Sequence, residues 1–263
     1  MAEALFLRDL FWALTTLSEV VLVGYLLRRG LHHSHWVFLL YILTAIGQSV
    51  SLFVVYRRWG FDSFIAWKFA WASQAVVVGA RWSAVISIAR DLLSAYRGIW
   101  ALAKRILASV SVSVLAYALL FSKGRWYQIV MNAERATELS IASFVVALFL
   151  FARYYALPEK PLQRALAIGF GLYSCFCVIN FSLFKEWLAS YTSLWNFLDV
   201  VTFLASVLLW INAVRVYAPP KAVQEHFLVP QETYSRVSAE LNLRLRLLNE
   251  QLDHLLRSGD QRS

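Results

Sequence analysis

The sequence predicts an all-α polytopic membrane protein with seven transmembrane helices, followed by a separate amphipathic helix at the C-terminus. The chain of 263 residues is 60% hydrophobic and only 16% charged, whereas about a quarter of the residues in soluble domains are charged. Its apolar residues gather in long runs, each close to the roughly twenty residues that a helix needs to cross a bilayer. The 11 Trp and 12 Tyr residues are side chains that favour the boundary between lipid and water.

Seven apolar stretches follow one another, separated by short polar connections. They are residues 6–27, 36–56, 63–89, 100–121, 132–154, 162–184 and 194–216. Together they define a transmembrane bundle over residues 1–216. The 5 prolines all fall outside these stretches, so no span shows the interrupted helix that many transporters use at a central binding site.

The distribution of Lys and Arg predicts the orientation of the bundle, because cytoplasmic connections collect basic residues. One side has Arg28, Arg29, Arg90, Arg97, Lys104, Arg105, Arg153, Lys160, Arg164 and Arg215, and the other has Arg8, Arg57, Arg58, Lys123, Arg125 and Lys185. This places the N-terminus outside and the C-terminus in the cytoplasm. The net charge of +9 is then explained by cytoplasmic loops that meet anionic lipid. Membrane lipids, and no nucleic acid, are therefore the expected partners.

The composition changes after the last span. Residues 217–230 are expected to form a Pro-containing linker, and residues 231–263 a cytoplasmic helix and tail. Leucines recur in this helix with the alternating spacing of a short coiled coil: Leu241, Leu245, Leu248, Leu252 and Leu255. Two interpretations stay open. The helix lies on the bilayer or on the protein's own loops, or residues 231–258 bind a second copy or a partner protein.

Polar side chains within the spans are costly in lipid and usually face protein or water. Five of them fall near the centre or in the outer half of the bilayer: Glu19, Gln48, Glu138, Asn180 and Asp199. They are the candidate ligand-binding residues of a polar cavity that opens outward. Hydrogen bonds that only hold helices together, or an ion or proton path, are the alternatives.

The third span carries an arginine deep in the membrane. At about 100° per residue, Gln74 and Arg81 share one face of the helix, whereas Lys68 points away and is expected to reach the outer boundary. Arg81 cannot lose its proton and needs a partner. Glu19, the deepest available carboxylate, is the first expected partner, and Asp199 is the second.

Metal and cofactor chemistry find no support in the sequence. None of the histidines, His32, His33, His35, His226 and His254, lies in an expected span, which argues against an intramembrane haem or zinc site. The chain also has no phosphate-binding loop, dinucleotide motif or serine nucleophile elbow. We therefore expect no cofactor and no metal, and we do not favour an enzyme.

The overall pattern resembles uncharacterised seven-helix inner-membrane proteins of bacteria. The run SFIAWKFAWASQAVVVGARWSAVISIARDLLSAYRGI, residues 63–99, carries the resemblance most clearly. It implies a multi-pass protein of the bacterial cytoplasmic membrane and brings no activity or site residues with it.

Binding or sensing is the function that the sequence favours. A small molecule or lipid would enter the outer polar cavity, and the cytoplasmic tail helix would relay its presence. One alternative is a membrane enzyme that modifies a lipid or isoprenoid with Glu19, Glu138 or Asp199 as the acid. Another is a scaffold subunit of a membrane complex, or a transporter.

Overall fold

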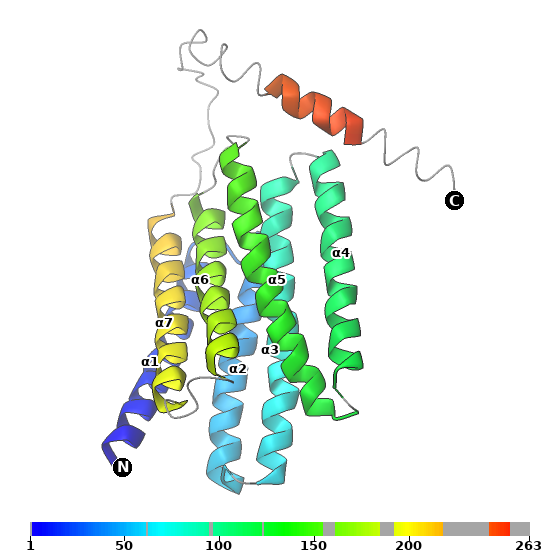
Figure 1. Ribbon diagram of the computed structural model, residues 1–263. Coiled ribbons are helices and arrows are strands. Elements are labelled where there is room, and N and C mark those ends of the chain that lie inside the picture. The colour runs from blue at the N-terminus through cyan, green and yellow to red at the C-terminus, as the bar shows by residue number, and fades with distance from the viewer. Residues whose placement is uncertain are drawn as a thin grey trace.

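The computed structural model describes residues 2–61, 63–94, 97–122, 124–154, 161–184, 192–217 and 242–252, and these residues form helices joined by short turns (Figure 1). The helices of the bundle are α1 (Ala2–Arg28), α2 (Trp36–Trp59), α3 (Phe64–Leu93), α4 (Arg97–Leu120), α5 (Trp126–Tyr154), α6 (Pro161–Phe184) and α7 (Thr192–Val216). A further helix spans residues 242–252.

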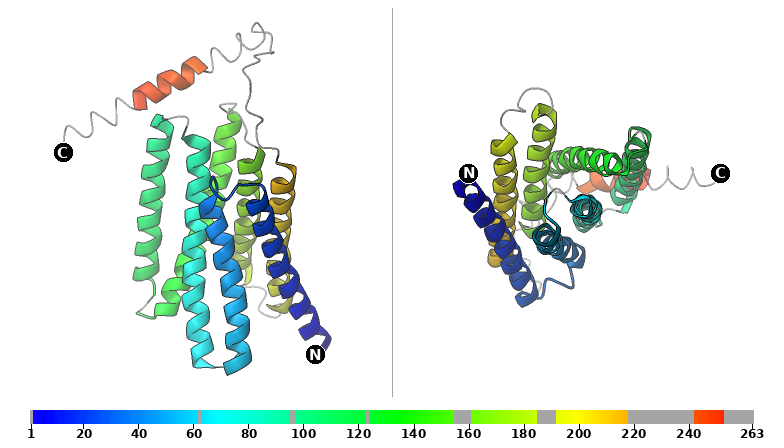
Figure 2. Two further views of the ribbon diagram at one scale, coloured as in Figure 1. Left: turned by 180° about the vertical axis from the view of Figure 1, so that it is seen from behind. Right: turned by 90° about the horizontal axis from the view of Figure 1, so that it is seen from below.

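Helix α3 lies inside the bundle. It packs against α2, α4, α5 and α6, while α1 and α7 close the far side by packing on each other and on α2 and α6 respectively. Helix α4 lies at the edge, against α5 and α3, as the end view of Figure 2 shows. Side chains of α3 can therefore meet side chains from several helices.

The bundle has the architecture of a multi-pass membrane protein. By length and apolar composition, 6 of its helices can cross a membrane, namely all except α3 among those described. Large apolar side chains also cover its outer surface, for example Val112, Leu115 and Leu119 on α4 and Leu150 on α5. Such a surface is unusual in water and suits a lipid environment.

An aromatic cluster joins α2, α6 and α7. The ring of Trp210 lies 4.9 Å from that of Phe170 and 5.2 Å from that of Phe38 between ring centres, within the range of favourable aromatic contacts. The indole Nε1 of Trp210 donates a hydrogen bond of 3.2 Å to the carbonyl of Leu166. Gly169 permits this approach, because a Cβ there would overlap the indole.

The helix of residues 242–252 packs on the end of the bundle at which α3 finishes and α4 begins (Figure 1, orange). Leu245 is buried there against Leu93, Ile99 and Leu148. The side-chain Oδ1 of Asn249 accepts a hydrogen bond of 2.5 Å from the backbone N–H of Gly98. Leu245, one of the leucines whose spacing suggested a coiled coil, is thus buried against the protein's own helices. Residues 218–241 and 253–263, the rest of the expected linker and tail, lie outside the described residues.

We expect Gly98→Ala to displace the helix of residues 242–252. A Cβ at this position would lie 2.7 Å from Asn249 Oδ1 and 2.9 Å from the Asn249 carbonyl oxygen, both closer than packed atoms allow. Spin labels at Lys104 and Leu247 should report a broader distance distribution in the variant. Gly79→Ala is the matched control, since nothing lies within 4 Å of a Cβ there. An unchanged distribution in Gly98→Ala would contradict this docking.

Candidate functional site

A buried ion pair lies at the centre of the bundle. Arg81 of α3 is 4% exposed and Glu138 of α5 is fully buried, and Nη1 of the arginine donates to Oε1 of the carboxylate. The other carboxylate oxygen, Oε2, accepts a hydrogen bond of 2.6 Å from the hydroxyl of Ser174 on α6. Both oxygens of Glu138 are therefore engaged, and one group of side chains ties α3 to α5 and α6.

Two tyrosines flank the guanidinium of Arg81. Its central carbon lies 4.6 Å from the ring centre of Tyr173 on α6 and 5.8 Å from that of Tyr41 on α2. A cation facing an aromatic ring at this range gains about 0.5–2 kcal/mol, more when water is excluded. The aromatic faces therefore add to the stabilisation that the carboxylate gives the guanidinium, whose Nε has no hydrogen-bond partner among the described residues.

A line of hydrogen bonds runs beside the ion pair toward the end of the bundle at which α2 finishes and α3 begins. Nε2 of Gln48 on α2 donates to Oε1 of Gln74 at 2.8 Å, and Nε2 of Gln74 donates to Oε1 of Glu134 on α5 at 2.6 Å. Nε2 of Gln48 also lies 3.3 Å from the hydroxyl oxygen of Ser73. Gln74 acts as both acceptor and donor, so these side chains form one continuous polar chain across three helices. We call Gln48, Gln74 and Glu134 the polar chain.

The polar chain ends at a groove between α1 and α2, which we call the outer groove. It has a volume of about 430 Å³ and is lined by Trp12, Gln48, Ser49, Leu52, Phe53, Tyr56, Arg57 and Phe61. The rings of Trp12 and Phe53 stack with their centres 5.0 Å apart. The groove thus combines an aromatic wall with one amide and one guanidinium, which is a common composition for a small-molecule site.

The structure places the five candidate residues in different surroundings. Gln48 lines the outer groove, and Glu138 belongs to the ion pair. Asp199 on α7 accepts a long contact of 3.9 Å from the thiol of Cys177 on α6. Asn180 is half-buried near the carboxyl end of α6. The described lining of the outer groove includes only Gln48 of the five.

Glu19 is not the carboxylate that the structure places at Arg81. That position belongs to Glu138, because α3 packs against α5, whereas α1 packs mainly against α2 and α7. Glu19 is only 1% exposed, and its Oε2 has no hydrogen-bond partner among the described residues. The inward face that joins Gln74 and Arg81 was predicted correctly, as was the different direction of Lys68, which is exposed and has its Nζ 4.3 Å from the ring centre of Phe64. That Lys68 reaches the outer boundary of the membrane stays a prediction.

Ser174 and Tyr173 are parts of the ion-pair site that the sequence did not reveal as such. Both lie on α6 among apolar neighbours, and a serine or tyrosine in a span is common enough to carry no signal by itself. The sequence signal that could have found this site is the four-residue spacing of Glu134 and Glu138, because it places two carboxylates on one face of α5.

A comparison of the chain with protein-family models, with curated proteins and with solved structures gives no match in any of the three.

We expect the ion pair to be strongly cooperative in stability. Removing one charge leaves the other buried and unpaired, so Arg81→Met or Glu138→Leu alone should destabilise the bundle by about 3–5 kcal/mol. The double variant Arg81→Met/Glu138→Leu should recover much of this loss, because no unpaired charge remains.

Equilibrium unfolding in detergent micelles, monitored by circular dichroism, would measure this double-mutant cycle. Arg90→Met is the control, since Arg90 is an exposed arginine of the same helix. Additive losses in the two single variants would show that the pair is not coupled.

Proposed function

We propose that the protein is a seven-span receptor of the bacterial cytoplasmic membrane. It binds a small amphiphile or lipid in the outer groove and relays binding through α3 to the helix of residues 242–252. The observation that carries this proposal is the polar chain, which joins the groove at Gln48 to Gln74 on α3. We also propose that all seven helices of the bundle cross the membrane, that the N-terminus lies outside and the C-terminus in the cytoplasm, and that the membrane is the bacterial cytoplasmic one.

The composition of the outer groove supports an amphiphilic ligand. Trp12, Phe53 and Phe61 offer aromatic surface for a hydrocarbon chain or ring. Arg57 and Gln48 offer a charged donor and an amide at the polar parts of the wall. A carboxylate or phosphate group on an apolar body matches this arrangement, because a guanidinium recognises both with paired hydrogen bonds.

Helix α3 supports a relay because it contacts both the outer groove and the helix of residues 242–252. Ser73 and Gln74 contact Gln48 of the groove. Leu93 near the carboxyl end of α3 packs against Leu245 of the helix of residues 242–252, which we call the tail helix. The helix is unbroken over 30 residues. A change in the position of Gln74 therefore moves a rigid element whose other end supports the tail.

The packing of α3 supports its role as the seventh span. It contacts α2, α4, α5 and α6, so most of its surface faces protein rather than lipid. Arg81 is the charged residue in its central part, residues 69–89, and that charge is paired with Glu138. Paired charges of this kind are tolerated within membrane bundles.

The basic side chains support a cytoplasmic position for the tail. Arg28, Arg29, Arg90, Lys104, Arg105, Arg153 and Arg215 lie near the helix ends on the side of the tail helix. Arg57, Arg58 and Arg125 lie near the opposite ends. This asymmetry follows the rule that cytoplasmic connections are the more basic.

The tail helix has a surface left for a second copy or a partner protein. Leu243 is 58% exposed and Leu247 is 49% exposed, and they lie four residues apart on the face away from Leu245. A partner that binds this face would sense whether the helix is docked.

An enzymatic role finds less support. A catalytic acid must be able to give its proton to a substrate, whereas both oxygens of Glu138 are engaged by Arg81 and Ser174. Glu19 and Asp199 do not line the outer groove as described. The arrangement therefore favours binding over catalysis.

We expect Ser49→Trp to block ligand binding, because an indole there would fill much of the outer groove. The probe is a diazirine-bearing fatty acid added to protein in lipid nanodiscs, with labelled residues identified by peptide mass spectrometry. Wild-type protein should be labelled in residues 48–61, and Ser49→Trp should lose most of this label. Ser83→Trp, at an exposed position of α3 outside the groove, should keep it.

The relay is tested in the same samples. Adding the fatty acid should shift the distance between spin labels at Lys104 and Leu247 in the wild type and leave it unchanged in Ser49→Trp. Equal labelling of all three proteins would contradict the groove as the binding site. Labelling without a distance change would contradict the relay.

A further inference from the structure

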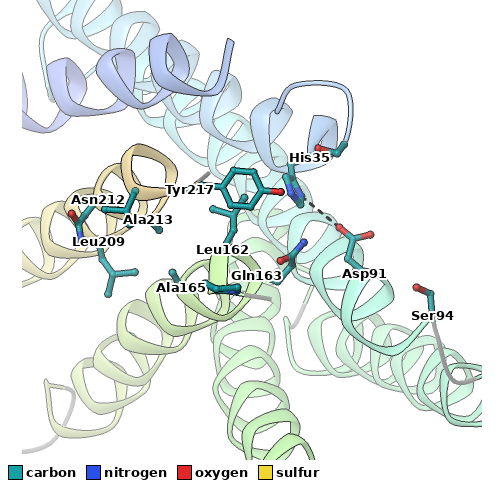
Figure 3. A pocket seen from close by; sticks show the side chains of 13 residues that line it. His35, Asp91, Ser94, Leu162, Gln163, Ala165, Leu209, Asn212, Ala213 and Tyr217 are labelled. Atoms are coloured by element: carbon teal, nitrogen blue, oxygen red, sulfur yellow. Dashed lines mark ion pairs between the residues drawn. The ribbon is translucent and has the colours of Figure 1, made fainter. Parts of the chain in front are cut away.

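A second and larger cavity lies at the opposite end of the bundle from the outer groove. It has a volume of about 1000 Å³, at the upper end of the range for small-molecule sites. The amino ends of α2 and α6 and the carboxyl ends of α3 and α7 surround it (Figure 3). We call it the inner cavity.

One side of the inner cavity is polar. The buried His35 places its Nδ1 3.5 Å from Oδ2 of Asp91, whose side chain is 29% exposed. Figure 3 shows Gln163 beside this pair. Gln163 is 9% exposed, and its Oε1 is a buried acceptor with no hydrogen-bond partner among the described residues. A buried amide oxygen of this kind costs free energy unless a donor reaches it.

The other side of the inner cavity is apolar. Leu209, Ala213 and Val216 on α7 form most of this wall, with Asn212 as a polar residue among them, and Leu162 of α6 continues it. A ligand that fills the cavity must therefore carry a polar end for Gln163 and Asp91 and an apolar body for α7.

Side-chain charge, rather than the helix dipoles, decides which polar end fits. The carboxyl ends of α3 and α7 favour a cation and the amino ends of α2 and α6 favour an anion, so these effects of about 0.3–1 kcal/mol each largely cancel. Arg29 further neutralises the end of α7, donating to the carbonyls of Arg215 at 2.8 Å and Tyr217 at 3.3 Å. Among the described lining residues, Asp91 is acidic and none is Lys or Arg.

We propose that the inner cavity binds an amphiphile that carries a primary ammonium group. Its N–H groups donate to Oε1 of Gln163 and to the carboxylate of Asp91, and its hydrocarbon lies along Leu209, Ala213 and Val216. A quaternary ammonium would not satisfy Gln163, because it has no N–H to donate. This site is separate from the outer groove, and the proposal does not depend on the function assigned to that groove.

Binding of dodecylamine to the full chain in nanodiscs, measured by isothermal titration, tests the proposal. Dodecanol and dodecyl phosphate have the same hydrocarbon with a neutral or an anionic end, and they should bind at least about tenfold more weakly, since hydrogen bonds to a charged donor are the stronger ones. Equal affinity for dodecanol or dodecyl phosphate would overturn the proposal.

Variants locate the site. Gln163→Leu removes the unpaired acceptor and should weaken dodecylamine binding by about tenfold, and Leu209→Trp should block the apolar wall. Gln128→Leu, the same change outside both cavities as described, should bind as the wild type does. Asp91→Asn should also weaken binding, and the first two variants keep the test decisive if this one does not fold. Unchanged affinity in Gln163→Leu would overturn the proposal.

Competition distinguishes the source of the amine. Vesicles of phosphatidylethanolamine should displace dodecylamine if the natural ligand is a membrane lipid, whereas phosphatidylcholine, with a quaternary group, should not. Dodecylamine binding that neither lipid displaces would assign the site to a free lipophilic amine. Displacement by phosphatidylcholine as effective as by phosphatidylethanolamine would overturn the role of the N–H donors.

Discussion

Arg81 imposes the constraint on which the rest of the bundle depends. Its guanidinium stays protonated under all physiological conditions, and it lies deep within a bundle whose outer surface is apolar. Such a charge is tolerated only when it is paired and its hydrogen-bonding groups are satisfied. The bundle pairs the charge with Glu138 of α5, whose second oxygen accepts from Ser174 of α6, while Nε of Arg81 has no hydrogen-bond partner among the described residues. The contact of α3 with both of these helices is therefore a condition for burying the charge as well as a consequence of apolar packing.

The polar chain follows from the register that the ion pair sets. Helices α3 and α5 run in the same direction and are neighbours. From Arg81 to Gln74 the rise along α3 is about 10 Å, and from Glu138 to Glu134 along α5 it is about 6 Å. Long side chains cover the difference, so Gln74 and Glu134 meet at 2.6 Å. Gln48 then joins from α2. The polar wall of the outer groove is thus an extension of the central pair.

Helical periodicity predicted the inward face of α3, because the rotation between Gln74 and Arg81 depends only on their separation in the chain. The span of residues 36–56 likewise matches α2 closely, since apolar length is a local property. The partner of Arg81 depends on which helices are neighbours, and depth in the bilayer does not specify this. Glu19 has a suitable depth, yet α1 packs mainly on α2 and α7. The two cavities depend on how side chains fill the space between helices, which the sequence pattern does not describe.

Helix α3 also connects the two cavities. Gln74 contacts the outer groove through Gln48, while Asp91 lines the inner cavity two residues before Leu93, which supports the tail helix. Coupling between ligand sites is typically about 1–3 kcal/mol, less than the 3–5 kcal/mol or so that breaking a buried ion pair costs. A ligand in either cavity is therefore too weak an influence to separate Arg81 from Glu138. A relay through α3 that leaves this pair intact would be a tilt about the pair, which would move the two ends of the helix in opposite directions. Because such coupling is reciprocal, an amine that fixes Asp91 would change the affinity of the outer groove by the same factor as a ligand in that groove changes the affinity for the amine.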